Sequence, residues 1–393
     1  MKIDRRTLLA GGLGTLALGA APAFSWEQGF DTSSAGIVGQ TGSVTPLLSP
    51  ATLQATQMAA DTYAGLASAG GWQGHPFTHR LSLGVRSPDA AWLRQRLATT
   101  GDLAPQHAAG DVVDSFVDAA IRRFQARHGL TVDGVAGAGT FEALNRPAAD
   151  KARILAANLP RLETALTDER RQVTVNVPSA QLEMVEDGGV VLRQSAVVGQ
   201  PDRATPLLTS AIHEINFNPF WHVPKSIIRR DLIPIIRDDR EYLTRMDMRI
   251  LDANWNEVSP DSIDWSTEEA ANYTFRQQPG SRNALGRVRI NFANQHAVYL
   301  HDTPDPGLFG DASRFHSSGC VRVQRIPEFV SWLLKETPGW PPETVSEFLG
   351  NGERRDVAIT NPIPVHFVYV TAWGEPGGPA QFRDDIYNLM ENV

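Results

Sequence analysis

The sequence predicts a multidomain α+β protein, in which a small three-helix domain precedes a mostly β domain that carries a helical insertion. Apolar residues recur with a helical period between about residues 81 and 145, and they alternate with the strand period from residue 171 onward. Between residues 217 and 288 the alternation is interrupted. A chain of 393 residues is long enough for two or three domains and can bury a sizeable core without disulfide bonds.

The first domain, residues 81–148, is predicted from three helices. Ser87-Pro88-Asp89 supplies a cap, a first-turn proline and an early acid, and Gly101 ends the helix that follows. A third, short helix is expected from Thr140. The second helix is predicted by apolar residues at helical spacing, which we expect to form the core: Val113, Phe116, Val117, Ala120, Ile121 and Phe124.

The mostly β domain is expected over residues 173–393, after a linker helix at residues 149–172. Within it, residues 222–282 form an insertion with helical stretches at 226–236 and 239–242. A long excursion of this kind is often a cap over a site, and a surface subdomain is the alternative. The predicted strands are residues 173–177, 182–185, 190–198, 207–217, 288–292, 298–301 and 364–373.

Residues 1–23 have the pattern of an export signal. Lys2, Arg5 and Arg6 precede an uncharged stretch that is too short to span a bilayer comfortably and ends in Ala21-Pro22-Ala23. Cleavage after Ala23 is therefore expected, with the protein exported to the periplasm and associated with the cell wall. The adjacent arginines suggest the twin-arginine route, and the Sec route stays open. Residues 24–80 are interpreted as an N-terminal arm or scaffold with a helical patch near 49–66.

Composition excludes several classes of partner. A net charge of −8 argues against nucleic acid or an anionic membrane surface as the main partner. No later apolar run approaches transmembrane length, so no membrane span is expected after removal of the signal. Neither metal-ligand spacing nor a phosphate-cradling glycine loop occurs, so we expect no metal and no other cofactor.

The only cysteine, Cys320, is the strongest candidate for chemistry. A lone thiol in an exported chain makes no internal disulfide, which favours a nucleophile. A nucleophilic cysteine needs a base or a positive environment, and His301, at the end of a predicted strand, is the obvious base. The Ser317-Ser318-Gly319 run lets backbone N–H groups converge as an oxyanion hole requires. For His316, His213 and His222, packing or surface roles are at least as well supported.

Two sets of motifs resemble known families. Ala120-Ile121-Arg122-Arg123-Phe124-Gln125 and Val132-Asp133-Gly134-Val135-Ala136-Gly137 resemble the peptidoglycan-binding domain found beside many wall enzymes. His301-Asp302-Thr303-Pro304 and Ser317-Ser318-Gly319-Cys320-Val321-Arg322-Val323 resemble the active-site signature of the L,D-transpeptidases, whose catalytic domain is YkuD-like. Further segments are similar to the long YcbB-like branch: Thr205-Pro206, residues 217–224, residues 279–286, Thr371-Ala372-Trp373 and residues 382–387.

The resemblance implies roles for individual residues. Cys320 would be the nucleophile and His301 the general base and later the acid, with Gly319, Ser318 and Arg322 as oxyanion or substrate-binding residues. Many members have His where this chain has Ser318, which puts oxyanion-hole detail in doubt more than catalysis. The implied reaction joins peptidoglycan stem peptides through a thioester, from a tetrapeptide donor to an amine acceptor. Alternatives are an L,D-carboxypeptidase or endopeptidase, an enzyme that attaches a wall protein, and a non-catalytic wall-binding protein.

Overall fold

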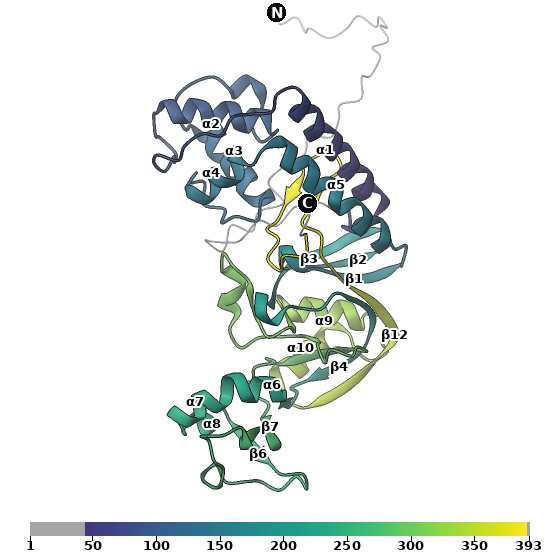
Figure 1. Ribbon diagram of the computed structural model, residues 1–393. Coiled ribbons are helices and arrows are strands. Elements are labelled where there is room, and N and C mark those ends of the chain that lie inside the picture. The colour runs from purple at the N-terminus through teal and green to yellow at the C-terminus, as the bar shows by residue number, and fades with distance from the viewer. Residues whose placement is uncertain (1–43, 391–393) are drawn as a thin grey trace, which may run out of the picture.

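The computed structural model describes residues 44–390. The expected export signal and the first part of the arm lie outside the described residues. Figure 1 shows an elongated molecule, with a helical region at one end, a large sheet in the middle and the insertion at the other end. This arrangement confirms the predicted α+β class. None of the helices between residues 44 and 390 combines the length and apolarity needed to cross a bilayer.

The three predicted helices of the first domain are present as α2 (Pro88–Thr99), α3 (Ser115–Arg127) and α4 (Ala138–Asn145). The Ser87 side chain caps α2 by accepting the N–H of Asp89, as the sequence predicts. The prediction for Phe116 is wrong, because its side chain is 54% exposed and stacks on His107 at 3.9 Å. The helical spacing places Phe116 at the edge of the apolar stripe, where neither α2 nor α4 covers it.

The helices on either side of this domain pack against each other. They are α1 (Pro50–Ser68), which matches the helical patch expected near residues 49–66, and α5 (Ala148–Ala165), which occupies the expected linker. Between them and α3, Lys151 lies fully buried with its ammonium 3.3 Å from His128 Nε2. Beside this pair, Arg127 forms a buried ion pair with Asp102 at 2.6 Å. The junction between the helical domain and the rest of the chain is therefore a buried polar cluster.

The large sheet has the strand order β10-β3-β11-β9-β8-β4-β12-β1-β2, and β2 also pairs with β3. Because β2 and β3 meet, the strands close into a ring with β10 as an extra edge strand. The bounds are β1 (Arg171–Asn176), β2 (Gln181–Glu186), β3 (Gly189–Gly199), β4 (Leu208–Phe217), β8 (Val288–Phe292), β9 (Leu300–His301), β10 (Phe315–Ser317), β11 (Val321–Val323) and β12 (Arg355–Val368); a separate pair is β13 (Ala372–Trp373) with β14 (Gln381–Phe382).

Two helices that the sequence did not predict pack on the core side of this sheet. They are α9 (Ile326–Leu334) and α10 (Pro342–Asn351), and their apolar residues join the strand residues in one core. Strand β12 also begins nine residues earlier than predicted. Its first half is interrupted by a register shift between Ala358 and Ile363, where Asn361 and Pro362 hide the alternation of a strand.

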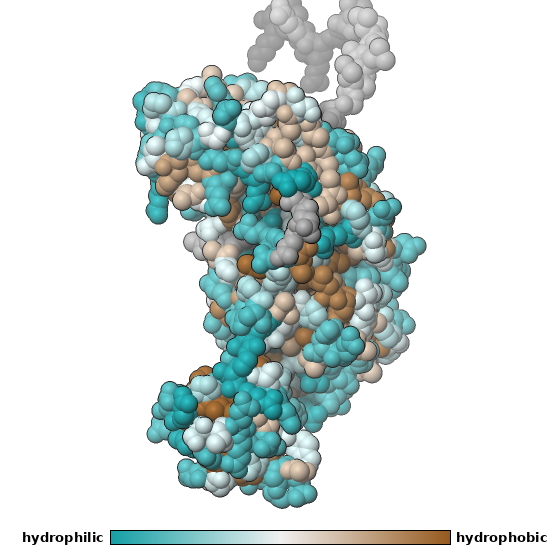
Figure 2. Space-filling model, viewed as in Figure 1, coloured by the Kyte–Doolittle hydropathy of each residue, from teal (hydrophilic) through white to brown (hydrophobic). Residues whose placement is uncertain are grey.

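The insertion, which we call the cap, folds around its own core. It contains α6 (Lys225–Ile227), a π-helical turn at Ile228–Leu232, α7 (Ile233–Asp238) and α8 (Tyr242–Arg245), close to the predicted helical stretches. A three-stranded sheet that was not predicted completes it: β5 (Trp221–His222), β7 (Thr274–Gln277) and β6 (Met248–Leu251). The cap core is separate from the core of the large sheet, and Figure 2 shows the cap as a mainly hydrophilic lobe.

Candidate active site

Cys320 lies in the short loop between β10 and β11 and is half-buried. Gly319 turns this loop with a φ of +113°, a value that side chains rarely tolerate. Ser317 ties it together, since its Oγ accepts the N–H of Gly319 at 3.1 Å and donates to the Cys320 carbonyl. Thr205 supports it from behind by donating to the Gly319 carbonyl at 2.9 Å. The thiol is therefore held on a fixed backbone.

Strand pairing brings Cys320 and His301 to the same face of the sheet. Strands β11 and β9 are parallel neighbours, with Val321 opposite Leu300 and both fully buried in the core. Because side chains alternate along a strand, the residues on either side of this pair face the other way. These residues are Cys320, Arg322, Tyr299 and His301.

The hydrogen bonding of His301 suits a general base. Its Nδ1 lies 2.6 Å from the carbonyl of Asp302, which can only accept, so Nδ1 carries the proton and Nε2 keeps its lone pair. Burial, and then the charge of Arg322, lower the pKa of His301 to about 3. The imidazole is therefore neutral at pH 7 and ready to accept a proton.

The thiol is protonated in the same environment. Burial raises the pKa of Cys320 to about 11, against the opposing effects of hydrogen bonds from Tyr299 and the charges of Arg289 and Arg322. With a neutral imidazole and a protonated thiol, the resting site does not hold a thiolate–imidazolium pair. An attack by this sulfur on a carbonyl would need a base to take its proton.

Tyr299 is a site residue that the sequence analysis missed. It forms a backbone and a side-chain hydrogen bond with Cys320, and its hydroxyl also interacts with Trp221 of the cap. Its ring centroid lies 5.7 Å from that of His301. The signal was available, because a residue two positions before His301 shares its face of a strand.

The other predicted site residues have different surroundings. The N–H of Gly319 is donated to Ser317 Oγ, which differs from the expectation that it serves an oxyanion hole. The N–H groups of Ser318 and Cys320 make no hydrogen bond within residues 44–390, which leaves both as donors for that role. Arg322 lies on the same face as the thiol, and its buried Nε has no hydrogen-bond partner in the described chain.

Ser318 connects the loop that holds Cys320 to the cap. Its side chain is exposed and its Oγ lies 3.0 Å from Arg203, which in turn binds both carboxylate oxygens of Asp231 at 2.7 Å. Asp231 belongs to the π-helical turn of the cap. Ser318, which stands where many relatives are expected to have His, is thus linked to an ion pair here.

The three other histidines that were considered from the sequence are exposed, in agreement with the packing or surface roles expected for them. His316 pairs with Asp311 at 3.4 Å, and His213 lies on β4. His222 lies on β5 of the cap, where burial and then three arginine charges lower its pKa. Within residues 44–390, none of the three forms a hydrogen bond with the Cys320 thiol.

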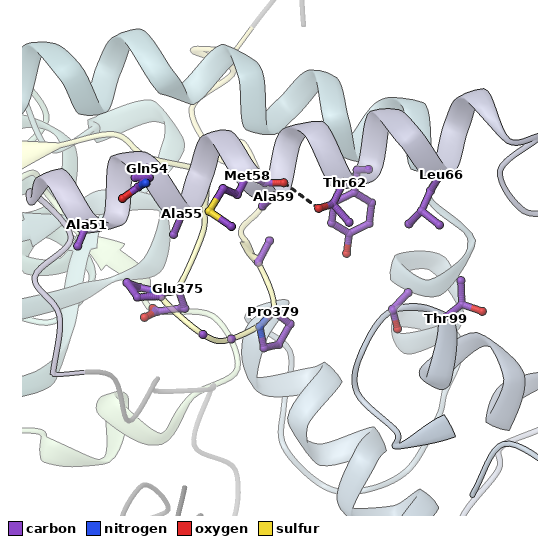
Figure 3. Close-up of a pocket in the computed structure, with 16 residues that line it drawn as sticks. Ala51, Gln54, Ala55, Met58, Ala59, Thr62, Leu66, Thr99, Glu375 and Pro379 are labelled. Atoms are coloured by element: carbon purple, nitrogen blue, oxygen red, sulfur yellow. Dashed lines mark hydrogen bonds between the residues drawn. The ribbon is translucent and has the colours of Figure 1, made fainter. Parts of the chain in front are cut away.

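A separate groove of about 490 Å³ lies elsewhere on the molecule, between α1, the end of α2 and the loop before β14. Figure 3 shows Met58 and Leu66 of α1 on one side of it and Glu375 and Pro379 on the other. Neither Cys320 nor His301 lines this groove. It does not belong to the candidate active site.

Comparisons with known proteins identify two domains in the chain. Residues 170–343 match the family model described as "L,D-transpeptidase catalytic domain" (YkuD), and residues 86–144 match "Putative peptidoglycan binding domain". A protein of Haemophilus influenzae, named "Putative L,D-transpeptidase", is 38% identical over 240 residues, which are 61% of this chain and 48% of that protein. The chain thus spans about half the length of this curated relative.

Solved structures of L,D-transpeptidases are also similar, at low identity. The enzyme from Stackebrandtia nassauensis is 15% identical with a TM-score of 0.27, over 78% of this chain and 100% of the other. The enzyme from Mycobacterium smegmatis is 14% identical with a TM-score of 0.24, over 50% of this chain and 58% of the other. On the two family models, residues 170–343 are an L,D-transpeptidase catalytic domain of the YkuD family and residues 86–144 are a peptidoglycan-binding domain.

Proposed function

We propose that this protein is a cysteine-dependent L,D-transpeptidase that joins peptidoglycan stem peptides outside the cytoplasm. The observation that carries the proposal is the shared face of Cys320, His301 and Tyr299, on which the imidazole has its proton fixed on Nδ1. The peptidoglycan-binding domain supports a location at the wall and a role in cell wall organisation and cell shape.

In the first step, His301 Nε2 takes the thiol proton while Cys320 Sγ attacks the carbonyl of the third residue of a tetrapeptide stem. The oxyanion of the tetrahedral intermediate receives hydrogen bonds from the N–H of Cys320 and the hydroxyl of Tyr299. The intermediate collapses, the peptide bond breaks, and His301 returns its proton to the amine of the leaving D-alanine. The product is a thioester on Cys320.

In the second step, the side-chain amine of a diamino acid from a neighbouring stem attacks the thioester carbonyl. His301 takes a proton from this amine and gives it to the departing sulfur, which restores the thiol and leaves a cross-link between two third-position residues. Water competes for the same thioester, so the acceptor decides between cross-linking and carboxypeptidase activity.

The test is to incubate the purified chain with disaccharide-tetrapeptides and to follow the products by mass spectrometry. We expect dimers that have lost one D-alanine, and no such product with Cys320→Ala. His316→Ala is the matched control, because it changes an exposed residue of the same loop region. Cys320-dependent tripeptides without dimers would indicate the hydrolase. Wall binding without any Cys320-dependent product would indicate a binding protein.

A further inference from the structure

Three arginines from different elements gather where the cap meets the sheet. Arg276 lies on β7 of the cap, Arg289 on β8, and Arg354 directly before β12. The guanidinium groups of Arg276 and Arg354 lie 4.8 and 5.5 Å from the centre of the Phe220 ring. Burial is the largest cause of the lowered pKa of His222, and the charges of all three arginines lower this pKa further. We call them the arginine cluster.

The arginine cluster adjoins the nucleophile through Arg289. This residue is opposite His301 in the pairing of β8 with β9, and its guanidinium lies 5.5 Å from the centre of the Tyr299 ring. Its charge acts on the Cys320 thiol as well as on His222. A substrate bound at Cys320 would therefore have Arg289 beside it, and Arg289 shares its effect on His222 with Arg276 and Arg354.

Acidic groups of the protein do not neutralise the arginine cluster fully. Within residues 44–390, Arg276 has no carboxylate partner, and its Nε is buried without a hydrogen-bond acceptor. Arg289 donates to the amide oxygen of Asn216 at 3.1 Å. Of the three, Arg354 alone has an ion pair, an exposed one with Asp356 at 2.8 Å. In contrast Arg249, the cross-strand neighbour of Arg276, pairs with Glu257 at 3.4 Å.

A buried guanidinium N–H without an acceptor is costly, and the planar fork of arginine matches a carboxylate. The interaction with an aromatic ring leaves the edge of the guanidinium, where the N–H groups point, available for such a ligand. Resting on the proposed function, we infer that Arg276, supported by Arg289 and Arg354, binds a free carboxylate of the donor stem peptide at the junction of the cap and the sheet. The site would therefore select donors that keep this carboxylate over donors in which it is amidated.

The test combines protein variants with modified donors. Acylation of Cys320, followed as release of D-alanine, is measured for donors with free carboxylates and for donors amidated singly at the second or the third residue. For the wild type we expect amidation of the recognised carboxylate to lower kcat/KM about 10- to 100-fold, mainly through KM. Arg276→Gln should lower kcat/KM for the free donor by a similar factor and remove the preference, and Arg276→Lys should restore part of it.

Arg245→Gln is the control, because Arg245 is an exposed cap arginine that pairs with Asp239. A full preference for the free donor in Arg276→Gln, or equal effects of Arg276→Gln and Arg245→Gln, would overturn the inference. Calorimetric binding of the same donors to Cys320→Ala separates the two proposals, since it needs no turnover. Carboxylate-dependent binding without any acylation of the wild type would contradict only the proposed function. Equal binding of free and amidated donors would contradict the inference, even in an active enzyme.

Discussion

Arg203 and Asp231 form a two-point ion pair, with both nitrogen–oxygen distances at 2.7 Å, that joins the loop after β3 to the cap. Arg203 also forms a hydrogen bond with Ser318, two residues before Cys320. The pair is partly exposed, so its contribution to the free energy of unfolding is expected to be modest. The pair links positions, because Arg203 bonds both Asp231 of the cap and Ser318 of the loop that holds Cys320.

The first prediction concerns this connection. Asp231→Asn should lower kcat/KM for the tetrapeptide about 3- to 10-fold, with a melting temperature within about 2 °C of the wild type, because the loop loses a support while the core is unchanged. Asp238→Asn, which alters another exposed acid of the cap, is the control and should have no effect on kcat/KM. A large loss of stability in Asp231→Asn would show that the pair maintains the fold instead.

The second prediction concerns the reactivity of the thiol. With a pKa of about 11 for Cys320, the thiolate fraction at pH 7 is far below that of an ordinary cysteine, whose pKa is about 8.5. Alkylation of Cys320 by iodoacetamide, followed by mass spectrometry, should be slower than that of glutathione by about two orders of magnitude at pH 7 and should still rise with pH above 9. Rapid alkylation with a plateau near pH 7 would indicate a preformed thiolate.

The third prediction follows from the neutral imidazole. Because the pKa of His301 is about 3 and that of Cys320 about 11, both groups keep the reactive protonation state across the intervening range. The rate of acylation by a donor should therefore vary little between about pH 5 and 9, measured by single-turnover release of D-alanine. A fall in rate centred near pH 6.5 would mean that His301 titrates like an exposed histidine.

The fourth prediction concerns Tyr299. Its hydroxyl is a hydrogen-bond partner of the thiol. Tyr299→Phe should therefore lower kcat by about 10- to 100-fold and leave KM nearly unchanged, because the lost hydrogen bond matters most in the tetrahedral state. Tyr273→Phe changes a partly buried tyrosine of the cap and serves as the control. An unchanged kcat in Tyr299→Phe would assign the hydroxyl a packing role beside Trp221.

Site residues with local sequence motifs were predicted, and those whose contacts depend on segments far apart in the chain were not. Cys320 and His301 were proposed from their chemistry and local motifs. Alternation predicted the strand that ends at His301, whereas the three-residue strand β11 that follows Cys320 was not predicted. Tyr299 was missed although it shares a strand face with His301, because its contact with Cys320 arises only from the parallel pairing of β9 with β11, segments about twenty residues apart. Phe116 was misjudged for a related reason, since helical spacing identifies a stripe but does not say how much of it neighbours cover.

The last prediction concerns the buried cluster between the helical domain and α5. His128 is stacked between Phe124 and Phe382, with ring centroids 3.8 and 5.3 Å away, and lies beside the Lys151 ammonium. Burial, and then the charges of Arg127 and Lys151, hold the pKa of His128 well below its usual value. The folded state thus keeps His128 neutral, while the unfolded state protonates it below about pH 6.5.

Because the unfolded state binds the additional proton, the free energy of unfolding falls as the pH drops below about 6.5, by at most about 1.4 kcal/mol per pH unit for this group. His301 contributes in the same direction, so the informative quantity is the difference between variants. Between pH 7.5 and 5.5, urea unfolding of His128→Gln should lose about 1 kcal/mol less stability than the wild type, and His213→Gln, an exposed control, should behave like the wild type. Equal losses in all three proteins would mean that His128 is protonated in the folded chain, and that the junction opens to water at acidic pH.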